Sequence, residues 1–469
     1  MSDKQETILT KSNGVGLFAS PGCGKSLMAV SLITLSRASR VLVICPTSVV
    51  GVWPREFERH SKEKFELAPL RNTSRKTPMS VAEKARAAEK AIDYVDREEK
   101  KLVMVVNYES AWRAPLADIL KSVEWDMIVL DESHKIKSNS STVSKFCREL
   151  ATLNPKSYRL ALTGTPSGGS CLDFYPQISF LNTSVFGTNY TAYQRRYTIQ
   201  NKFGQQKEPI NQKDLRRRLD SVSFTATEEV LKDSLPDKTE SIKECPVSGE
   251  ALGIYDAVES GMWAELESAE SEAVLARVII VQLQRCAQIV GGHVGGVINK
   301  DNPNDDPKVR RIKGASKLDT LKEIIEGKPK EENVVVFARF REELEMIREL
   351  GESMGLNIGE ISGSRKDALT PNSEMKPGID LCIVQTASGN AGIDLTAANH
   401  CVYYSLPLSL IEYDQSTKRC WRPGQEKTTH FYFLVAPDTV DEKIYNSLMN
   451  KQEITEYFKQ EARRRQASE

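Results

Sequence analysis

Short apolar runs, each followed by glycine or polar residues, recur along the chain and predict buried β-strands. In the first half these runs are Val15–Phe18, Val41–Cys45, Leu102–Val106, Met127–Leu130 and Tyr158–Leu162. Continuous apolar runs of this length are typical of parallel strands that helices cover on both faces. Longer stretches with helical composition separate the runs, for example residues 79–101, which are rich in Ala, Glu and Lys. The first half therefore predicts an α/β fold with a doubly wound parallel sheet.

The second half repeats this pattern and predicts a second sheet. Its apolar runs are Asn333–Phe337, Ile379–Val384, His400–Tyr404 and His430–Val435, and Ser316 opens a helix before the first of them. Between the two halves, residues 186–235 are polar and basic, and residues 252–289 have helical character. We expect residues 232–247 to link the two sheets and residues 299–309 to form a surface loop.

A glycine-rich segment after the first predicted strand indicates a nucleotide site. Gly22 and Gly24 allow the backbone to turn so that successive N–H groups point at phosphate oxygens. Lys25 supplies a positive charge for the β- and γ-phosphates, and Ser26 a hydroxyl for magnesium. The predicted nucleotide-binding residues of this loop are Pro21, Gly22, Cys23, Gly24, Lys25 and Ser26. The alternative is a plain glycine turn between a strand and a helix, since Ala19 stands where the usual pattern begins with glycine.

Two adjacent carboxylates follow the fourth apolar run. Ligands of open α/β sheets bind at the carboxyl ends of the strands, which is where Asp131 and Glu132 are expected. We predict that Asp131 holds magnesium through water and that Glu132 orients and deprotonates the attacking water. Alone, an Asp-Glu pair is common on protein surfaces, and its place after an apolar strand and a phosphate loop favours the catalytic interpretation.

Composition narrows the class of protein. The chain has 64 basic and 64 acidic residues, so net charge predicts no polyanionic partner and any nucleic-acid surface must be local. The nine cysteines include no Cys-x-x-Cys pair, which favours reduced core thiols over a disulfide or zinc framework. No apolar run approaches the length of a membrane span, and the N-terminus is polar. We expect a soluble protein of the bacterial or viral cytoplasm, or of the nucleus in a eukaryote.

Taken in order, several blocks resemble the SWI/SNF-like branch of superfamily-two helicases. The blocks are residues 22–26, Asp131-Glu132-Ser133-His134, Thr163-Gly164-Thr165-Pro166, the stretch 386–398 and the stretch 415–425. The sequence departs from the family pattern at residues 167–169, which read Ser-Gly-Gly in place of Ile-Gln-Asn. It departs again at Trp421 and Pro423, which replace histidine and isoleucine. The resemblance covers residues 14–450 and leaves no room for chromatin-reading modules, so we expect a minimal motor core.

The resemblance implies two RecA-like lobes, each with a helical protrusion. The first lobe would comprise residues 1–240, with its protrusion at about 185–235. The second would comprise residues 241–469, with a protrusion at about 250–312, a RecA-like domain at about 313–450 and a C-terminal helix.

The same resemblance assigns further site residues. Gln415 and Arg419 share one helical face, and Pro423 and Gly424 end that helix just after Arg422. Gln415, Arg419 and Arg422 would act with Lys25 and the acidic pair in catalysis. Gly392 and Asp394 would face the nucleotide, and Gln5 is the candidate for reading the adenine edge. The residues expected to contact nucleic acid are Pro46, Thr47, Asn107, Thr163, Arg216, Arg217, Thr386 and Ser388. For each arginine, a solvated helix face is an equally good interpretation.

The function implied is a DNA-stimulated ATPase that uses ATP and Mg²⁺ to translocate along double-stranded DNA as a monomer. Branched and single-stranded DNA stay open as partners. A strand-separating DNA or RNA helicase is the related alternative, because a strand-separating wedge has no sequence signature. A nucleotide-gated clamp with little turnover is the alternative of another class, although a clamp does not need Glu132. A phosphate-loop kinase would have no reason to carry the 415–425 block.

Overall fold

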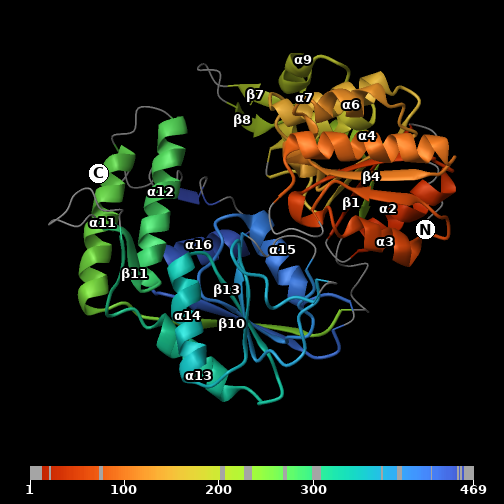
Figure 1. Ribbon diagram of the computed structural model, residues 1–469. Coiled ribbons are helices and arrows are strands. Elements are labelled where there is room, and N and C mark those ends of the chain that lie inside the picture. Colours follow the sequence, from red (N-terminus) through yellow and green to blue (C-terminus); the bar gives the residue numbers. More distant parts are fainter. Residues whose placement is uncertain are drawn as a thin grey trace. The chain divides into compact units, whose positions relative to one another are not determined.

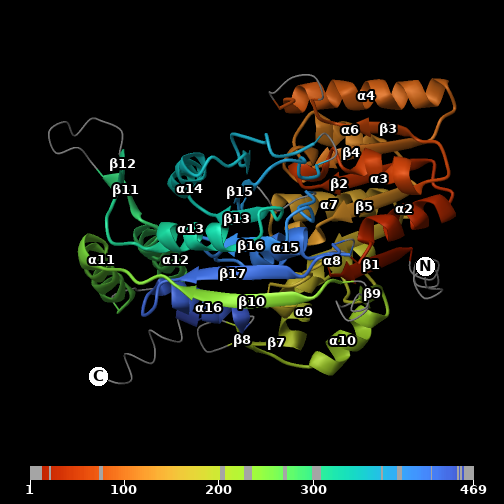
Figure 2. The ribbon, with the colours of Figure 1, turned by 90° about the horizontal axis from the view of Figure 1, so that it is seen from below.

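The computed structural model describes residues 13–20, 23–72, 78–168, 170–200, 206–226, 235–267, 272–297, 308–370, 373–387, 393–423, 425–450, 454 and 457–458. The chain forms two compact units, Met1–Asp233 and Ser234–Glu469. Each unit contains one parallel sheet with helices on both faces, so the predicted α/β class is confirmed. Figures 1 and 2 show the helices and strands of both units.

The first unit is built on a seven-stranded sheet with the order β3-β4-β2-β5-β6-β1-β9. All its strand pairs are parallel. The strands are β1 (Gly14–Ala19), β2 (Arg40–Cys45), β3 (Glu66–Pro69), β4 (Leu102–Asn107), β5 (Met127–Asp131), β6 (Tyr158–Thr163) and β9 (Ser223–Ala226). The five predicted strands are all present, and the short strands β3 and β9 extend the sheet at its two edges.

Successive side chains of the central strands enter two different cores, because they alternate between the faces of the sheet. One core contains Val41 and Val43 and is covered by α2 (Lys25–Leu35) and α3 (Trp53–His60). The other contains Leu42 and Ile44 and is covered by helices on the opposite face (Figure 1). These helices are α4 (Val81–Arg97), α5 (Tyr108–Ala111), α6 (Leu116–Ser122), α7 (Thr142–Leu153) and α8 (Phe174–Leu181). The short 3₁₀ helices of this unit are η1 (Thr47–Val49), η2 (Ser133–Ile136) and η3 (Cys171–Asp173).

A subdomain lies between β6 and β9 in the sequence. It contains α9 (Tyr190–Tyr197), the antiparallel strands β7 (Thr198–Gln200) and β8 (Gln206–Pro209), and α10 (Gln212–Asp220). Its small core consists of Leu172, Tyr175, Tyr193, Tyr197 and Leu215. The predicted protrusion therefore carries a β-hairpin in addition to its helices.

The second unit is built on a six-stranded parallel sheet with the order β10-β17-β16-β13-β15-β14. Its strands are β10 (Lys238–Glu244), β13 (Val334–Ala338), β14 (Ile358–Ile361), β15 (Leu381–Gln385), β16 (His400–Tyr403) and β17 (Thr429–Val435). The expected linker at 232–247 is therefore wrong in part: residues 238–244 form an edge strand paired with β17.

Helices also cover both faces of the second sheet. One core is closed by α13 (Lys317–Gly327) and α14 (Arg341–Ser353). The other is closed by α15 (Leu410–Cys420), α16 (Val440–Met449) and the hairpin of α11 (Gly249–Glu267) and α12 (Glu272–Val290). A small antiparallel pair, β11 (His293–Val297) and β12 (Lys308–Arg311), follows this hairpin. The predicted loop at 299–309 lies mostly outside the described residues.

All nine cysteines are unpaired in the structure, and most of them are buried. Among the helices of the described residues, none combines the length and the apolar character needed to cross a membrane.

Candidate functional site

The start of α2 has the features of an anion site. Gly24 is the N-cap, with φ at +71°, a left-handed conformation that favours glycine. Among the described residues no side chain caps this helix, and its first turn contains no acidic residue, so the positive end of its dipole favours a phosphate. Lys25 Nζ donates to the carbonyl of Ala19 at 2.8 Å, which holds the ammonium group at the end of β1. Cys23 N donates to Ser20 O at 3.1 Å. Pro21 and Gly22 lie outside the described residues.

Asp131 ends β5, the second strand from β1 in the sheet, and its carboxylate is oriented by two donors. Trp53 Nε1 donates to Oδ2 at 3.0 Å, and the backbone N–H of Glu132 donates to Oδ1 at 2.9 Å. Burial and the charge of Glu132 raise the pKa of Asp131 to about 7, while the Trp53 hydrogen bond and the charge of Lys25 oppose this shift. A divalent cation favours the ionised carboxylate, so a cation bound at Asp131 would oppose this upward shift of its pKa.

Glu132 has a left-handed backbone, with φ and ψ both at 53°. This conformation is uncommon for a residue with a side chain and is often found where function requires it. The next residue anchors the turn: Ser133 is fully buried, and its hydroxyl donates to Gln177 Oε1 at 2.8 Å. Glu132 Oε2 lies 3.2 Å from His134 Nδ1. The left-handed turn thus places the Glu132 carboxylate beside the His134 ring.

Thr163 connects to this turn through His134. The Thr163 hydroxyl lies 3.1 Å from His134 Nδ1 and accepts from the N–H of Thr165 at 3.1 Å. The Thr163 side chain is fully buried. Through His134 it links the end of β6 to Glu132, and its contact with nucleic acid stays a prediction.

The carboxyl ends of β2 and β4 carry a polar network that includes Thr47 and Asn107. Thr47 Oγ1 donates to Glu109 Oε2 at 3.1 Å, and Asn107 Nδ2 donates to the same oxygen at 2.8 Å. Lys84 Nζ, itself buried, donates to Asn107 Oδ1 at 2.5 Å and to Ser110 Oγ at 2.8 Å. Burial alone would raise the pKa of Glu109, but the hydrogen bonds from Asn107 and Thr47 lower it.

Sequence reasoning missed Lys84 and Glu109. Lys84 lies in α4, within the stretch rich in Ala, Glu and Lys, and only the fold brings it to the strand ends. Pro46 precedes the short helix η1 and is its N-cap.

Arg216 and Arg217 lie on α10 and are exposed. Arg217 Nη2 donates to Asp214 Oδ1 at 2.7 Å, and Asp214 also pairs with Arg196 and Arg218. Hydrogen bonds from Tyr197 and Arg217 lower the pKa of Asp214. One carboxylate therefore offsets part of the positive charge of this helix.

In the second unit, Thr386 follows β15 and is buried. Its N–H and its hydroxyl both donate to the carbonyl of Ala338, at 2.9 and 3.3 Å. Gly363 N donates to Gln385 Oε1 at 3.2 Å, so residues after β13, β14 and β15 meet at this edge of the sheet. Ser388 and Gly392 lie outside the described residues, as does Gln5.

Asp394, Arg419 and Arg422 lie together. Arg422 Nη1 is 3.4 Å from Asp394 Oδ2, and Arg419 Nη1 donates to Ile393 O at 3.4 Å. The carbonyl of Arg419 accepts from Leu395 N at 3.1 Å.

The expected end of this helix is wrong: α15 ends at Cys420, and Arg422 lies outside it. The C-cap is Trp421, whose extended backbone ends the helix before Pro423. Trp421 Nε1 donates to Pro236 O at 2.8 Å, and Lys238 Nζ lies 4.7 Å from the centre of its ring. Gln415 and Arg419 are both on α15, as predicted.

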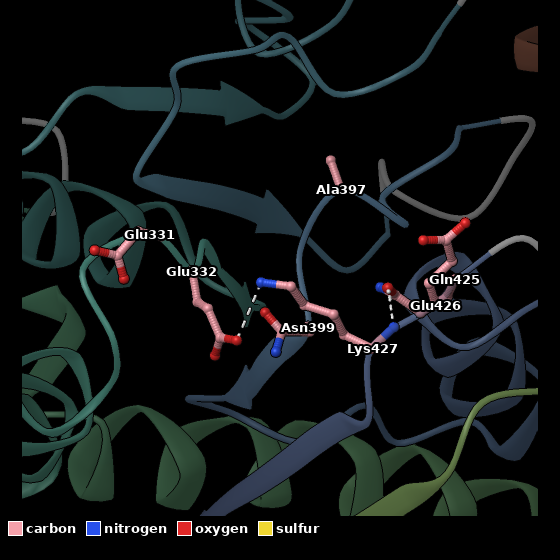
Figure 3. Close-up of a pocket in the computed structure, with 7 residues that line it drawn as sticks. All are labelled: Glu331, Glu332, Ala397, Asn399, Gln425, Glu426 and Lys427. Atoms are coloured by element: carbon pink, nitrogen blue, oxygen red, sulfur yellow. Dashed lines mark hydrogen bonds and ion pairs between the residues drawn. The ribbon is translucent and has the colours of Figure 1, made fainter.

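A pocket of about 250 Å³ lies at the amino-terminal ends of the strands of the second sheet, opposite the end at which Thr386 lies. It is lined by Glu331, Glu332, Ala397, Asn399, Gln425, Glu426 and Lys427 (Figure 3). Hydrogen bonds from Asn399 and His400 lower the pKa of Glu332 to about 2, and Lys427 Nζ lies 3.1 Å from its carboxylate. The pocket contains none of the predicted site residues. In the described part of the chain, no group of three or more His, Cys, Asp or Glu side chains is arranged to hold a metal.

Two family profiles and several curated proteins match most of the chain. The profile of the SNF2-related domain matches residues 7–290, more than half of the chain, and that of the helicase conserved C-terminal domain matches residues 316–424. The DNA repair and recombination protein RDH54 of Saccharomyces cerevisiae is 24% identical over 93% of this chain and 48% of its own length. RAD54B of Gallus gallus is 23% identical over 92% of this chain and 50% of its own length.

This chain thus spans about half the length of the curated relatives that it matches. Among solved structures, the Sulfolobus solfataricus SWI2/SNF2 ATPase core in complex with dsDNA aligns with a TM-score of 0.42 and 22% identity, covering 95% of this chain and 88% of that one. By the extent of the profile match, the chain belongs to the family defined by the SNF2-related domain.

Proposed function

We propose that this chain is a DNA-dependent ATPase that translocates along double-stranded DNA, with ATP and Mg²⁺ as cofactors. The observation that carries the proposal is the arrangement around β1 and β5. A helix that begins at Lys25, with Gly24 as its N-cap, follows β1, and an oriented Asp131 and a strained Glu132 stand at the end of β5. Phosphate binding and water activation therefore have separate residues within one unit.

In this proposal Lys25 binds the β- and γ-phosphates, and Ser26 and Asp131 hold the magnesium ion. The ion would neutralise charge on the phosphate oxygens. Glu132 would accept a proton from the attacking water, and His134 would orient its carboxylate through the contact at 3.2 Å.

The second unit would supply the cation for the transition state. Arg419 and Arg422 are the candidates, and Gln415 would act with them in catalysis. Gly392 and Asp394 would face the nucleotide. We propose that the two lobes comprise residues 1–240 and 241–469, and that closure of the lobes couples hydrolysis to DNA.

DNA would be gripped through its phosphates. Thr47 and Asn107 are held together at the strand ends of the first unit, and Arg216 and Arg217 add positive charge on α10. Names of relatives, such as "DNA repair and recombination protein", favour DNA over RNA as the partner. We further propose that the chain acts as a monomer in the cytoplasm, or in the nucleus if its source is eukaryotic.

The direct test is steady-state ATP hydrolysis with duplex DNA, single-stranded DNA and RNA side by side. The proposal expects the largest stimulation with duplex DNA. Turnover that is unchanged by every nucleic acid would overturn it, and a larger stimulation by single-stranded RNA would indicate a helicase-type function.

A further inference from the structure

Two buried aromatic residues outside the predicted site both hydrogen-bond to Asp131. Trp53 Nε1 donates to the carboxylate oxygen Oδ2 at 3.0 Å. The hydroxyl of Tyr108 donates to the main-chain oxygen of Asp131 at 2.9 Å. Asp131 is therefore fixed through its side chain by one ring and through its backbone by the other.

The two rings approach Asp131 from opposite faces of the sheet. Trp53 belongs to the core beneath α2 and α3, and Tyr108 belongs to the core beneath α4, α6 and α7. Their exposed fractions are 1% and 2%. Because close-packed side chains have little freedom of their own, each ring moves with the backbone segment that carries it.

Each ring is carried by a segment that also bears a proposed nucleic-acid contact. Tyr108 directly follows Asn107 at the end of β4. Trp53 begins α3, which follows the short helix of Thr47 through a turn in which Val52 N donates to Val49 O at 2.8 Å. The outer ends of both segments meet at one atom, Glu109 Oε2, which accepts from Thr47 and Asn107. Each segment thus has a polar outer end, Thr47 or Asn107, and an inner end, the ring that hydrogen-bonds to Asp131.

The carboxylate of Glu109 indicates what the outer ends recognise. One oxygen of this carboxylate, Oε2, accepts hydrogen bonds from two neutral donors. The charge of nearby Lys135 also favours the ionised form of Glu109. A phosphate oxygen has the same preference for hydroxyl and amide donors. A backbone phosphate that engages Thr47 or Asn107 would therefore compete with Glu109 and displace both segments together.

We propose that Trp53 and Tyr108 are positioning residues that transmit nucleic-acid contact at Thr47 and Asn107 to the Asp131–Glu132 turn. The inference rests on the proposed function, in which Asp131 holds magnesium and Glu132 activates water. A small shift of either segment reorients the Asp131 carboxylate and, through the N–H of Glu132 on Oδ1, the strained turn that follows. Packed cores convert such shifts into discrete rearrangements.

The test compares Trp53→Phe, Tyr108→Phe and the double variant with matched controls. Trp125 and Tyr193 are also buried in the first unit, and they donate to Leu120 O at 2.8 Å and to Cys171 O at 2.6 Å, away from Asp131. Trp125→Phe and Tyr193→Phe therefore remove the same kinds of bond at comparable burial. For each protein, ATP turnover is measured with and without saturating duplex DNA, and DNA affinity is measured separately.

The ratio of stimulated to basal turnover is the decisive readout, because it does not depend on the fraction of protein that is folded. We expect this ratio to fall about tenfold in the double variant, within the usual range of coupling between sites. DNA affinity should stay within about threefold of the parent, and both controls should keep the parent ratio. A double variant that keeps the parent ratio, or controls that lose it equally, would overturn the inference. Absence of DNA stimulation in the parent chain would instead overturn the proposed function.

Discussion

Arg422 Nη1 lies 3.4 Å from Asp394 Oδ2 in the second unit, and the two side chains are 34% and 33% exposed. Ion pairs with this exposure contribute about 0 to 1 kcal/mol to stability. Asp394 therefore orients Arg422 without holding the fold together, and the guanidinium could leave this partner for a phosphoryl group.

The first prediction concerns this arginine. Arg422→Ala should leave ATP affinity and DNA affinity within a few-fold, because the guanidinium would act on the transition state. DNA-stimulated turnover should fall by about 10³ to 10⁵, the effect of losing an arginine finger. Arg419→Ala should have a similar or smaller effect, since its guanidinium also donates to Ile393 O.

Asp394→Asn removes the ion pair and keeps the arginine, so it tests whether this pair orients Arg422. Calorimetric unfolding of each variant separates catalysis from stability. A destabilised Arg422→Ala protein with a proportionate loss of activity would contradict the assignment.

The second prediction separates Lys25 from Glu132. Lys25→Ala should weaken ATP binding as well as turnover, because the ammonium group would contact the ground-state phosphates. Glu132→Gln should bind ATP and magnesium nearly normally and stall hydrolysis, since only the base is lost. Binding of a fluorescent ATP analogue and single-turnover hydrolysis measure the two effects, and near-normal turnover by Glu132→Gln would place the base elsewhere.

The third prediction is that duplex DNA binds through its backbone. The logarithm of the association constant should fall linearly with the logarithm of salt concentration, at about 0.9 per phosphate neutralised. Arg216→Ala should reduce this slope and weaken binding to all sequences alike, because the arginine is exposed on α10. Fluorescence anisotropy with several duplex sequences measures both quantities. A flat salt profile or a strong sequence preference would be inconsistent with backbone contact.

The fourth prediction concerns stability and pH. His293 is 1% exposed, and burial lowers its pKa to about 4 from 6.5. Between these values the unfolded chain binds more protons at this position than the folded chain does. Stability of the second unit should therefore be fully present above pH 6.5 and fall progressively toward pH 4, by up to about 3 kcal/mol.

Urea unfolding of the parent and of His293→Leu from pH 4 to pH 8 measures this dependence. The leucine variant keeps an apolar side chain in the core and should lose this part of the acid sensitivity. An unchanged pH profile in His293→Leu would show that other groups cause it.

The sequence predicted the central strands because their side chains are buried on both faces, which leaves continuous apolar runs such as Met127–Leu130. It missed β10 because an edge strand with the sequence KTESIKE is exposed along most of its length. It placed the end of α15 too late because Pro423 was the visible stop signal, while the backbone of Trp421 already turns away.

The sequence likewise predicted only part of the candidate site. Lys25, Asp131 and Glu132 were predictable because they stand directly after apolar strands or in the phosphate loop. Their partners were not, because Trp53, Tyr108 and Lys84 are distant in sequence and meet the site only through packing. Hydrogen bonds between distant segments have no signature in a single sequence.

The central claim is ATP-driven movement along duplex DNA, and displacement of a triplex-forming strand tests it most directly. The parent chain should displace the third strand with ATP and Mg²⁺, Glu132→Gln should not, and a forked duplex should stay paired. Failure to displace the third strand at concentrations that saturate DNA and support ATP hydrolysis would contradict translocation, and separation of the forked duplex at the same rate would identify a strand-separating helicase.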